Sequence, residues 1–332
     1  MVLIVNKPTF KDFKPIKAKI KNNKDYYLDK IKIKKIYFTK SDERFYLFKK
    51  NNINYFLKEI NLAKIYSVKF LLSINKFLLR KKILVPKLKE NLIKNKFKKK
   101  HYFLVFEHIK GRYIEFNNNN LKLFSIYLSN FHYIIKFFNL RAIIKKNTQK
   151  RINKLEKIRV KFLNNTKEYR KIRNYKKIYN IFYKEKNLIL EYKKMYNFSQ
   201  ITHGDLVPGN IIFSNKNFFL LDFEDTHYSY FPIEFDIALV LERLILVKNI
   251  SKKEKLKKIR FFLKNYLNNT KNKKIKISII KSLKFISLRS LLMQISVFIN
   301  GKEYSNSEIS KFIQLYNKNI DFLKKIDDEF CE

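Results

Sequence analysis

Hydrophobic residues in the first hundred positions form strand-like runs and one helix-like stretch. Runs rich in β-branched and aromatic residues predict strands at 36–39, 45–49 and 53–60. Asn51 and Asn52 predict a turn between the last two runs, because Asn favours turns. Apolar residues at helical spacing predict a helix over 62–79, and the run 101–106 predicts a further strand. We therefore expect a sheet and one helix in this part of the chain.

The rest of the chain is dominated by the apolar period of helices. We predict helices at 121–140, throughout 141–200, and at 233–247, 252–268, 276–298 and 306–326. Asn306 or Ser307 is the expected N-cap of the last helix. His132 lies on an apolar helix side, where a hydrogen-bonded core histidine is commoner than a ligand. Aromatic residues interleaved with lysines at 169–196 indicate either a buried helix face, which we favour, or a surface that stacks bases.

Two short apolar runs near the middle of the chain predict a β-hairpin. Residues 211–213 and 218–223 flank the turn formers 214–217, which suits a loop of three or four residues. With Lys216 at the midpoint, Asn210 would lie opposite Asp222 on one face of the hairpin. Opposed residues have Cβ atoms about 5 Å apart. Amide and carboxylate oxygens are hard ligands, so this pair predicts a Mg²⁺ site.

Asp205 comes five residues before Asn210, in a segment that Gly204, Pro208 and Gly209 mark as a loop. A carboxylate beside a metal site is what phosphoryl transfer requires, because one acid accepts the proton of the attacking hydroxyl while metal holds the phosphates. His-x-Asp, four residues and Asn is also the spacing of a kinase catalytic loop. The alternative is a solvated polar loop that leads into an ordinary hairpin.

Three motifs in this stretch resemble the aminoglycoside phosphotransferase and choline kinase superfamily. They are His203-Gly204-Asp205, Asn210-Ile211-Ile212 and Leu221-Asp222-Phe223-Glu224. The resemblance extends to Asp236-Ile237-Ala238, to Leu128-Ser129-Asn130-Phe131-His132 and to residues 107–112. The basic helical stretch before His203 resembles the spore-coat-associated kinase-like branch of that superfamily.

The resemblance implies an α+β, two-lobed, protein-kinase-like fold with a small, mostly antiparallel β N-lobe and a larger helical C-lobe. Residues 1–106 would form the nucleotide-binding lobe, 107–112 the hinge that binds adenine through its backbone, and 113–332 the catalytic and acceptor lobe. ATP and Mg²⁺ would be the cofactors, and a small-molecule hydroxyl compound the acceptor.

The resemblance also implies a role for each site residue. Asp205 would be the catalytic base, and Asn210 and Asp222 would bind the metal. Lys58, at the end of an apolar strand, resembles the lysine that contacts the nucleotide phosphates, although it is also one of 63 lysines and could cap a strand edge. His203 and Asp236 would support the catalytic loop, with Asp236 bonded to its backbone. Four further residues are candidate acceptor contacts: Glu224, Asp225, Glu242 and Arg289.

Two features depart from that family pattern. Residues 61–80 contain no acid, so the predicted helix has no glutamate to pair with Lys58, and the adjacent Glu59 should point to the opposite strand face. Residues 39–44 contain no glycine, so no Gly-rich phosphate loop is expected. These departures favour a second hypothesis, a kinase-like scaffold or coat-associated protein with weak or no transferase activity.

The net charge of +46 suggests a third hypothesis, a basic helical protein that binds nucleic acid. Only 11 of the 74 basic residues are Arg, and the lysines occur from end to end. The chain is also rich in Asn, Ile, Phe and Tyr, which is typical of an AT-rich coding sequence. We therefore interpret most of the charge as solvated surface and expect no specific nucleic-acid partner.

Cysteine and hydropathy indicate the compartment. Cys331 is the single cysteine, which excludes a disulfide framework and fits a reducing compartment. No apolar run reaches 18 residues, so we expect no membrane span, and the apolar start of the chain is too short for a signal peptide. A cytoplasmic location is expected; the sequence does not indicate an oligomeric state.

Overall fold

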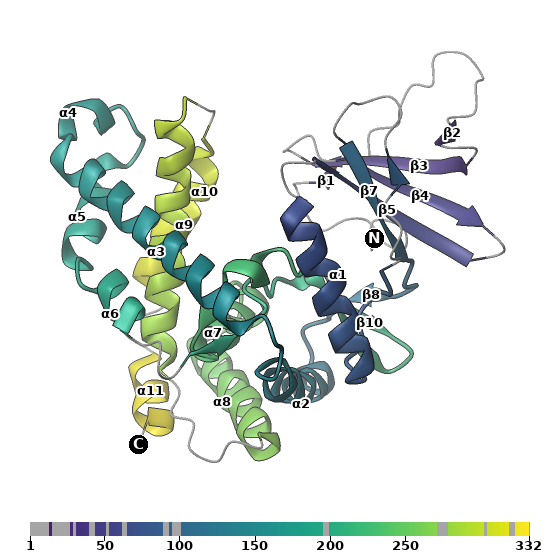
Figure 1. Ribbon diagram of the computed structural model, residues 1–332. Helices are drawn as coiled ribbons and strands as arrows, with labels where there is room; N and C mark the ends of the chain where they lie inside the picture. Colours follow the sequence, from purple (N-terminus) through teal and green to yellow (C-terminus); the bar gives the residue numbers. More distant parts are fainter. Residues whose placement is uncertain are drawn as a thin grey trace. The chain divides into compact units, whose positions relative to one another are not determined.

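The structure is a computed structural model. It describes residues 13–14, 27–28, 31–39, 44–50, 53–61, 65–88, 93–94, 101–194, 199–270, 278–301, 304–318 and 323–331. The chain divides into two compact units (Figure 1). Unit 1 comprises residues 1–115 and 208–224, and unit 2 comprises 116–207 and 225–332. This division places 208–224 with the N-terminal part of the chain, whereas we predict that these residues belong to the C-terminal catalytic lobe. The predicted lobe boundaries, 1–106 and 113–332, stay a prediction.

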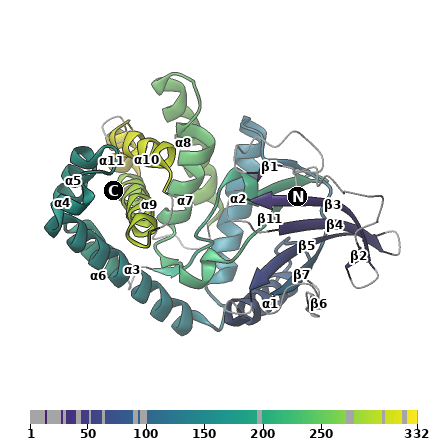
Figure 2. The same ribbon diagram turned by 90° about the horizontal axis from the view of Figure 1, so that it is seen from above.

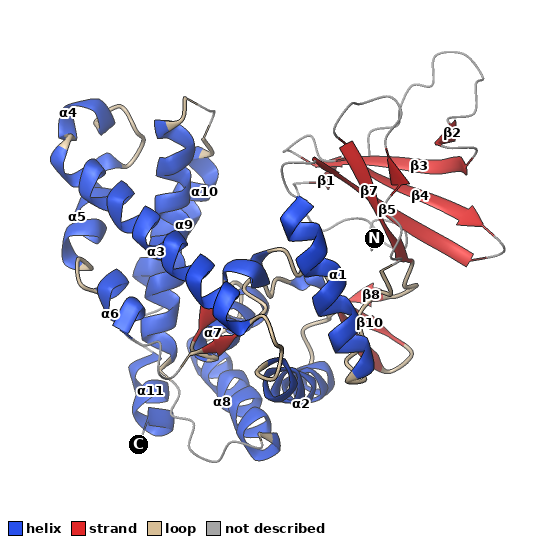
Figure 3. Ribbon diagram, in the orientation of Figure 1, coloured by secondary structure: helices blue, strands red, loops and turns tan. Residues whose placement is uncertain are grey.

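Unit 1 contains most of the strands, and unit 2 is built mainly of helices (Figure 3). The larger sheet of unit 1 has the order β1-β3-β4-β5-β7-β6, with β2 also paired to β3, and every pairing is antiparallel. Its strands are β1 (Phe13–Lys14), β2 (Tyr27–Leu28), β3 (Ile31–Thr39), β4 (Arg44–Lys50), β5 (Ile53–Asn61), β6 (Ile93–Lys94) and β7 (His101–Glu107). The predicted strands at 36–39, 45–49, 53–60 and 101–106 fall within four of these.

One helix, α1 (Ile65–Arg80), belongs to unit 1 and buries an apolar face that includes Phe70, Ile74 and Leu78. Asn75 on this helix is buried and holds the segment that follows. Its Nδ2 donates to the Pro86 carbonyl at 2.8 Å, and its Oδ1 accepts from the Leu88 N–H at 3.0 Å. This amide side chain therefore ties Pro86 and Leu88 to α1.

The predicted hairpin forms, but its register differs from the prediction. β10 (Ile211–Ser214) pairs with β11 (Asn217–Leu220) so that Ile211 lies opposite Leu220. The turn therefore has two residues, Asn215 and Lys216, and both have positive φ (48° and 63°), as a type I′ turn requires. The predicted loop of three or four residues was wrong, and so was the direct pairing of Asn210 with Asp222.

A third strand, β8 (Arg112–Tyr113), pairs with β10 to complete a three-stranded sheet in unit 1. Gly111 precedes β8 and lies against β10 so closely that a Cβ atom there would be 2.4 Å from Ile212 Cγ2. The sheet order and this contact fix the segment before β8 against the hairpin.

Unit 2 contains ten α-helices among its described residues, together with two short strands. The α-helices are α2 (Asn118–Ile135), α3 (Arg141–Asn164), α4 (Thr166–Tyr169), α5 (Tyr175–Lys184), α6 (Leu188–Lys194), α7 (Glu234–Leu241), α8 (Lys252–Asn269), α9 (Ile279–Ile299), α10 (Asn306–Lys318) and α11 (Lys324–Cys331). The strands β9 (Gln200–Ile201) and β12 (Tyr230–Phe231) pair with each other. The predicted helix at 306–326 is in fact divided between α10 and α11.

Helix α9 is the centre of unit 2 and contacts α3, α5, α6, α7, α10 and α11. Figure 2 shows α10 lying alongside it. Among the described helices, α9 alone is long and apolar enough to span a membrane, yet 56% of that window is buried within the protein. This is weak evidence for a span, because the core helix of a globular unit has the same composition.

Polar side chains cap the N-terminal ends of α9 and α10. Asp327 on α11 accepts from the backbone N–H groups of Ile279 (2.8 Å) and Ile280 (3.1 Å), and so caps α9. Ser305, rather than the predicted Asn306 or Ser307, caps α10, because its Oγ accepts from the Glu308 N–H.

Candidate active site

Lys58 lies in unit 1 between two carboxylates. It belongs to β5, where it is 8% exposed, and its Nζ lies 2.5 Å from Glu224 Oε1 and 3.4 Å from Asp222 Oδ1. The family pattern would supply a glutamate from α1, but α1 contains no acid. Glu224, which we considered an acceptor contact, is instead the closer partner of Lys58. The glutamate that the predicted helix lacks is therefore replaced by Glu224, an acid from a distant segment of the chain.

Asn210 and Asp222 flank the hairpin of unit 1 at its open end. Asn210 is the last residue of the 3-10 segment η4 (Pro208–Asn210), and its backbone oxygen accepts from the Leu221 N–H at 2.9 Å. Asp222 follows directly and adopts φ +57°, a conformation that Asp tolerates better than most residues. The left-handed conformation of Asp222 turns the chain away from the strand direction of β11. Asp222 is therefore not part of the strand, as the predicted pairing with Asn210 would require.

The donor set at this end of the hairpin suits a hard cation. An amide oxygen at Asn210 and carboxylates at Asp222 and Glu224 are oxygen ligands of the kind Mg²⁺ prefers, with its remaining positions taken by water and phosphate oxygens. Across the described residues, no group of three or more His, Cys, Asp or Glu side chains could hold a metal alone. The residues therefore fit a cation shared with a phosphate ligand better than a cage built by the protein.

Unit 2 holds the 203–205 loop by one buried carboxylate. Asp236, near the start of α7, is fully buried, and its oxygens accept from the backbone N–H of His203 (2.7 Å) and of Gly204 (2.9 Å). The His203 ring is also fully buried, and its Nδ1 accepts from the Asp205 N–H at 3.3 Å. Asp205 is thus positioned through its own backbone as well as through the loop before it.

His132 on α2 completes this hydrogen-bond network. Its Nε2 lies 3.1 Å from Asp236 Oδ2 and its Nδ1 lies 2.8 Å from the hydroxyl of Tyr266 on α8. In a neutral ring, Nε2–H donates to the carboxylate and Nδ1 accepts from Tyr266. Burial raises the pKa of Tyr266 well above its ordinary value, which keeps that hydroxyl a donor. His132 is therefore a hydrogen-bonded core residue, and α2, α7 and α8 together support the loop.

The segment 225–229 packs directly on the 203–205 loop within unit 2. Thr226 Oγ1 donates to the His203 carbonyl at 2.8 Å. Gly204 has φ +84°, and a Cβ atom added there would lie 2.0 Å from Ser229 Oγ and 3.3 Å from the Asp225 carbonyl oxygen. Only glycine fits this position, because both the conformation and the space exclude a side chain. The backbone of Asp225 is therefore a direct neighbour of the loop that carries Asp205.

Asp225 forms two ion pairs with arginines from different helices. Arg151 Nη1 on α3 lies 3.0 Å from its Oδ1, and Arg289 Nη2 on α9 lies 2.7 Å from its Oδ2. Burial alone would raise the pKa of Asp225, but the two guanidinium groups outweigh burial and lower the pKa below its ordinary value. The sequence singled out Asp225 and Arg289 as separate acceptor contacts; the structure brings them together and adds Arg151.

Glu242, the remaining candidate acceptor contact, is 1% exposed and begins a π-helical segment, η6 (Glu242–Leu246). Neither of its carboxylate oxygens has a hydrogen-bond partner among the described residues, and Arg243 Nε is 3.6 Å away. Burial raises the pKa of Glu242, while Arg243 and Lys311 oppose that rise. The Glu242 carboxyl is therefore a buried group that makes no hydrogen bond to the described residues.

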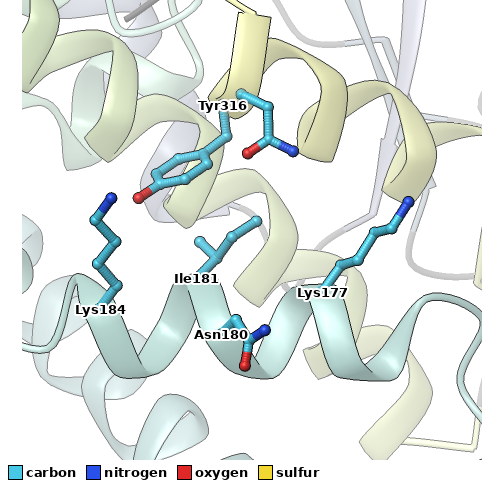
Figure 4. Close-up of a pocket in the computed structure, with 6 residues that line it drawn as sticks. Lys177, Asn180, Ile181, Lys184 and Tyr316 are labelled. Carbon is cyan, nitrogen blue, oxygen red and sulfur yellow. The ribbon is translucent and has the colours of Figure 1, made fainter.

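A cavity of about 250 Å³ lies elsewhere in unit 2, between α5 and α10. It is lined by Lys177, Asn180, Ile181, Lys184, Tyr316 and Asn317. Figure 4 shows Lys177 and Lys184 rising from α5 on either side of Ile181, with Tyr316 facing them. The Tyr316 hydroxyl donates to Glu185. None of the residues predicted for the active site lines this cavity.

Comparison with known proteins identifies related sequences and folds. Residues 162–252 match the model of the phosphotransferase enzyme family. No curated protein matches the chain.

Solved structures match over most of the chain. An amicoumacin kinase in complex with AMP-PNP, Ca²⁺ and Ami is 15% identical, with TM-score 0.62, 90% of this chain and 93% of that chain covered. A Plasmodium vivax ethanolamine kinase is 16% identical, with TM-score 0.55 and coverage of 87% and 81%. An AMP-bound spectinomycin phosphotransferase is 14% identical, with TM-score 0.55 and coverage of 89% and 93%.

These matches confirm the predicted resemblance to the aminoglycoside phosphotransferase and choline kinase superfamily, and they confirm the predicted α+β, two-lobed, kinase-like fold. The matched segment 162–252 contains Asp205, Asn210, Asp222 and Asp236. The roles of these residues, and of Lys58 and His203, stay predictions.

Proposed function

We propose that this protein, with its kinase-like fold and its phosphotransferase-family segment, transfers the γ-phosphate of ATP to a hydroxyl group of a small molecule, with Mg²⁺ as the metal. Support comes from the kind of groups that the chain gathers in each unit. Unit 1 offers oxygen ligands and a lysine for a metal-bound nucleotide, and unit 2 offers Asp205 for a hydroxyl. The metal would neutralise charge on the transferred phosphoryl group.

In the proposed reaction, Asp205 orients the acceptor hydroxyl and accepts its proton as the oxygen attacks the γ-phosphorus. The bond from that phosphorus to the bridging oxygen of ADP breaks, so ADP leaves with the electron pair. Asn210 and Asp222 would hold the metal, and Lys58 would contact the donor phosphates. No covalent enzyme intermediate is required, because positioning and charge neutralisation account for phosphoryl transfer.

The single observation that carries this proposal is the support of the 203–205 loop by Asp236. A surface loop needs no buried carboxylate, whereas this loop uses both oxygens of Asp236 on its backbone and a histidine ring on Asp205 itself. Such rigid support of a short acidic loop is what a positioned catalytic group requires. It favours an enzyme over the alternative of a kinase-like scaffold.

The experiment is acceptor-dependent ADP release from Mg-ATP, measured with a panel of amino alcohols, sugars, aminoglycosides and hydroxy acids. Asp205→Asn keeps the size of the side chain and removes its charge. We expect kcat to fall by about 10² or more while Mg-ATP affinity stays within a few-fold, as for a positioned acid–base group. Wild-type protein that binds Mg-ATP yet phosphorylates nothing in the panel would support the scaffold hypothesis instead.

A cytoplasmic location and the absence of a specific nucleic-acid partner belong to the same proposal. Binding to polyanions that disappears at moderate salt, without sequence preference, is the expected behaviour of a chain with net charge +46. Binding that persists at high salt and depends on sequence would favour the nucleic-acid hypothesis.

A further inference from the structure

The arginine cluster of Arg151, Asp225 and Arg289 carries more positive than negative charge. Two guanidinium groups share one carboxylate, and no other acid among the described residues forms an ion pair with either of them. Arg289 is 8% exposed, and its Nε has no hydrogen-bond partner in the part of the chain that the structure describes. A buried guanidinium with an unused donor is costly, so this cluster has capacity for a further acceptor group.

The surroundings of the arginine cluster do not supply that acceptor. Arg151 Nη2 donates to the sulfur of Met293 at 3.7 Å, and the Arg151 guanidinium lies 5.6 Å from the ring centre of Tyr228. Arg289 lies 5.6 Å from the ring centre of Phe235. Burial lowers the pKa of Arg151, and the neighbouring Arg289 lowers it further, in opposition to Asp225. The two cations therefore share the Asp225 carboxylate, and no second anion among the described residues pairs with either of them.

The arginine cluster also lies next to the proposed catalytic loop in the same unit. The Asp225 carbonyl is a close neighbour of Gly204, Ser229 Oγ donates to that carbonyl at 2.7 Å, and Thr226 is bonded to the His203 carbonyl. Asp225 itself is 32% exposed at its side chain and Arg151 is 19% exposed, so the cluster is accessible from solvent. An acceptor whose hydroxyl reaches Asp205 would place its other groups in this neighbourhood.

We propose that Arg151 and Arg289 bind an acidic group of the acceptor, so that the substrate is a hydroxyl compound bearing a carboxylate or a phosphate. This inference rests on the proposed phosphotransferase function and narrows its substrate class. Guanidinium groups bind planar carboxylate and phosphate oxygens through several N–H donors at once. A net positive cluster would disfavour a cationic acceptor.

The test compares small hydroxyl compounds of similar size and different charge. Glycerate and glycerol phosphate are the acidic probes, glycerol is the neutral probe, and ethanolamine is the cationic probe. Binding is measured by calorimetry at one fixed ionic strength, and ADP release from Mg-ATP is measured in parallel. We expect at least one acidic probe to bind about tenfold or more tightly than glycerol and ethanolamine, since one charge-assisted contact is worth about a factor of ten.

Variants then test whether the acidic probe binds at the arginine cluster, because the arginine and the aspartate variants should change its affinity in different directions. Arg151→Gln and Arg289→Gln should each weaken the acidic probe about tenfold, whereas Asp225→Asn, which frees both guanidinium groups, should leave its binding unchanged or tighter. A purely structural role would make all three variants less stable but would not give opposite effects on binding. Lys154→Gln removes an exposed positive charge from the same helix α3 and is the matched control for the general attraction of a basic protein.

The outcomes separate this inference from the proposed function. The inference would be overturned if glycerol or ethanolamine bound as tightly as both acidic probes. Full affinity of Arg151→Gln for the acidic probe would also overturn it. The Arg151 variant keeps the test valid if Arg289→Gln does not fold. An equal loss in Lys154→Gln would also overturn it. ADP release with ethanolamine but no acidic probe would leave the proposed function standing and the inference wrong. Cluster-dependent binding of an acidic probe without ADP release would support the inference and count against the transferase function.

Discussion

Lys58 in unit 1 and Asp225 in unit 2 are each held by two side chains of opposite charge. Lys58 is one cation between two carboxylates, Asp222 and Glu224, so its cluster has a net charge of −1. Asp225 is one carboxylate between two cations, Arg151 and Arg289, so its cluster has a net charge of +1. The two clusters have the same architecture with the signs reversed.

The difference between the clusters indicates what each can attract. An uncompensated negative charge beside oxygen ligands favours a cation such as Mg²⁺, and an uncompensated positive charge favours an anion. In a chain of net charge +46, the Lys58 cluster is a local exception to the general field. The arginine cluster has the same sign as the whole chain. The proposal that it binds an anion therefore depends on its local geometry rather than on the overall charge.

The largest expected effect comes from removing one carboxylate of the Lys58 cluster. Asp222→Ala should abolish Mg²⁺-dependent ATP binding, because it deletes a proposed metal ligand and makes the cluster neutral. The measurement is calorimetric titration of ATP with Mg²⁺ and with EDTA. Asp225→Asn removes a carboxylate from the cluster of opposite sign and should leave Mg-ATP affinity unchanged. Equal Mg-ATP affinity in Asp222→Ala and wild type would show that the Lys58 cluster does not bind the metal.

Asp236 differs from both clusters, because it is a buried carboxylate of unit 2 that is held mainly by neutral donors. Asp236→Ala should destabilise the protein by about 3 kcal/mol or more, since each unsatisfied buried donor costs about 1–3 kcal/mol, and it should lower activity as well. Chemical denaturation and ADP release are the measurements. Asp236→Asn, which keeps one acceptor oxygen, should lose less stability. A stable and active Asp236→Ala would show that the loop does not depend on this residue.

A smaller effect is expected from the cation at the centre of the first cluster. Lys58→Ala should weaken ATP affinity or turnover about tenfold, which corresponds to about 1.4 kcal/mol for one charge-assisted contact. Lys154→Ala, at an exposed position of α3, is the control. If Lys49→Ala produced the loss instead, the strand lysine would have been assigned wrongly.

The smallest effect concerns Glu242 and its dependence on pH. Burial raises the pKa of Glu242 above its ordinary value of 4.5. Above pH 4.5 the unfolded chain therefore loses this proton while the folded protein still keeps it. The stabilisation from this proton is present at low pH and is lost as pH rises through the raised pKa. Glu242→Gln should therefore make Tm higher than in wild type near neutral pH and similar near pH 4. A Tm difference that does not change with pH would contradict this assignment.

Local patterns in the sequence predicted most of the helices and strands and the 203–205 loop, whereas the two-lobed fold was predicted from the family resemblance of the motifs around that loop. The apolar period placed the helices, and the spacing of His203, Asp205 and Asn210 identified the loop before any geometry was known. The hairpin register could not be predicted in the same way. The turn Asn215–Lys216 has positive φ at both residues, and a lysine in that conformation carries no recognisable turn signal in the sequence.

The two ion clusters were hidden for a different reason. Lys58 and Asp222 are separated by 164 residues, and Arg289 and Asp225 by 64 residues, so neither contact follows from local spacing. The absence of an acid from α1 suggested that Lys58 lacked a partner, whereas Glu224 takes that place. Tertiary packing decides such pairs, and a sequence without a fold offers only their candidates.

The cap of α9 has a consequence for the order in which unit 2 can be completed during synthesis. Helix α9 is the centre of that unit, yet the carboxylate that satisfies its first N–H groups is Asp327, 48 residues later than Ile279. At typical elongation rates of about 5–20 residues per second, those residues take about 2–10 s to synthesise. During that interval the first turn of α9 depends on water for its hydrogen bonds. The central helix of the unit therefore reaches its final state only after α11 has folded against it.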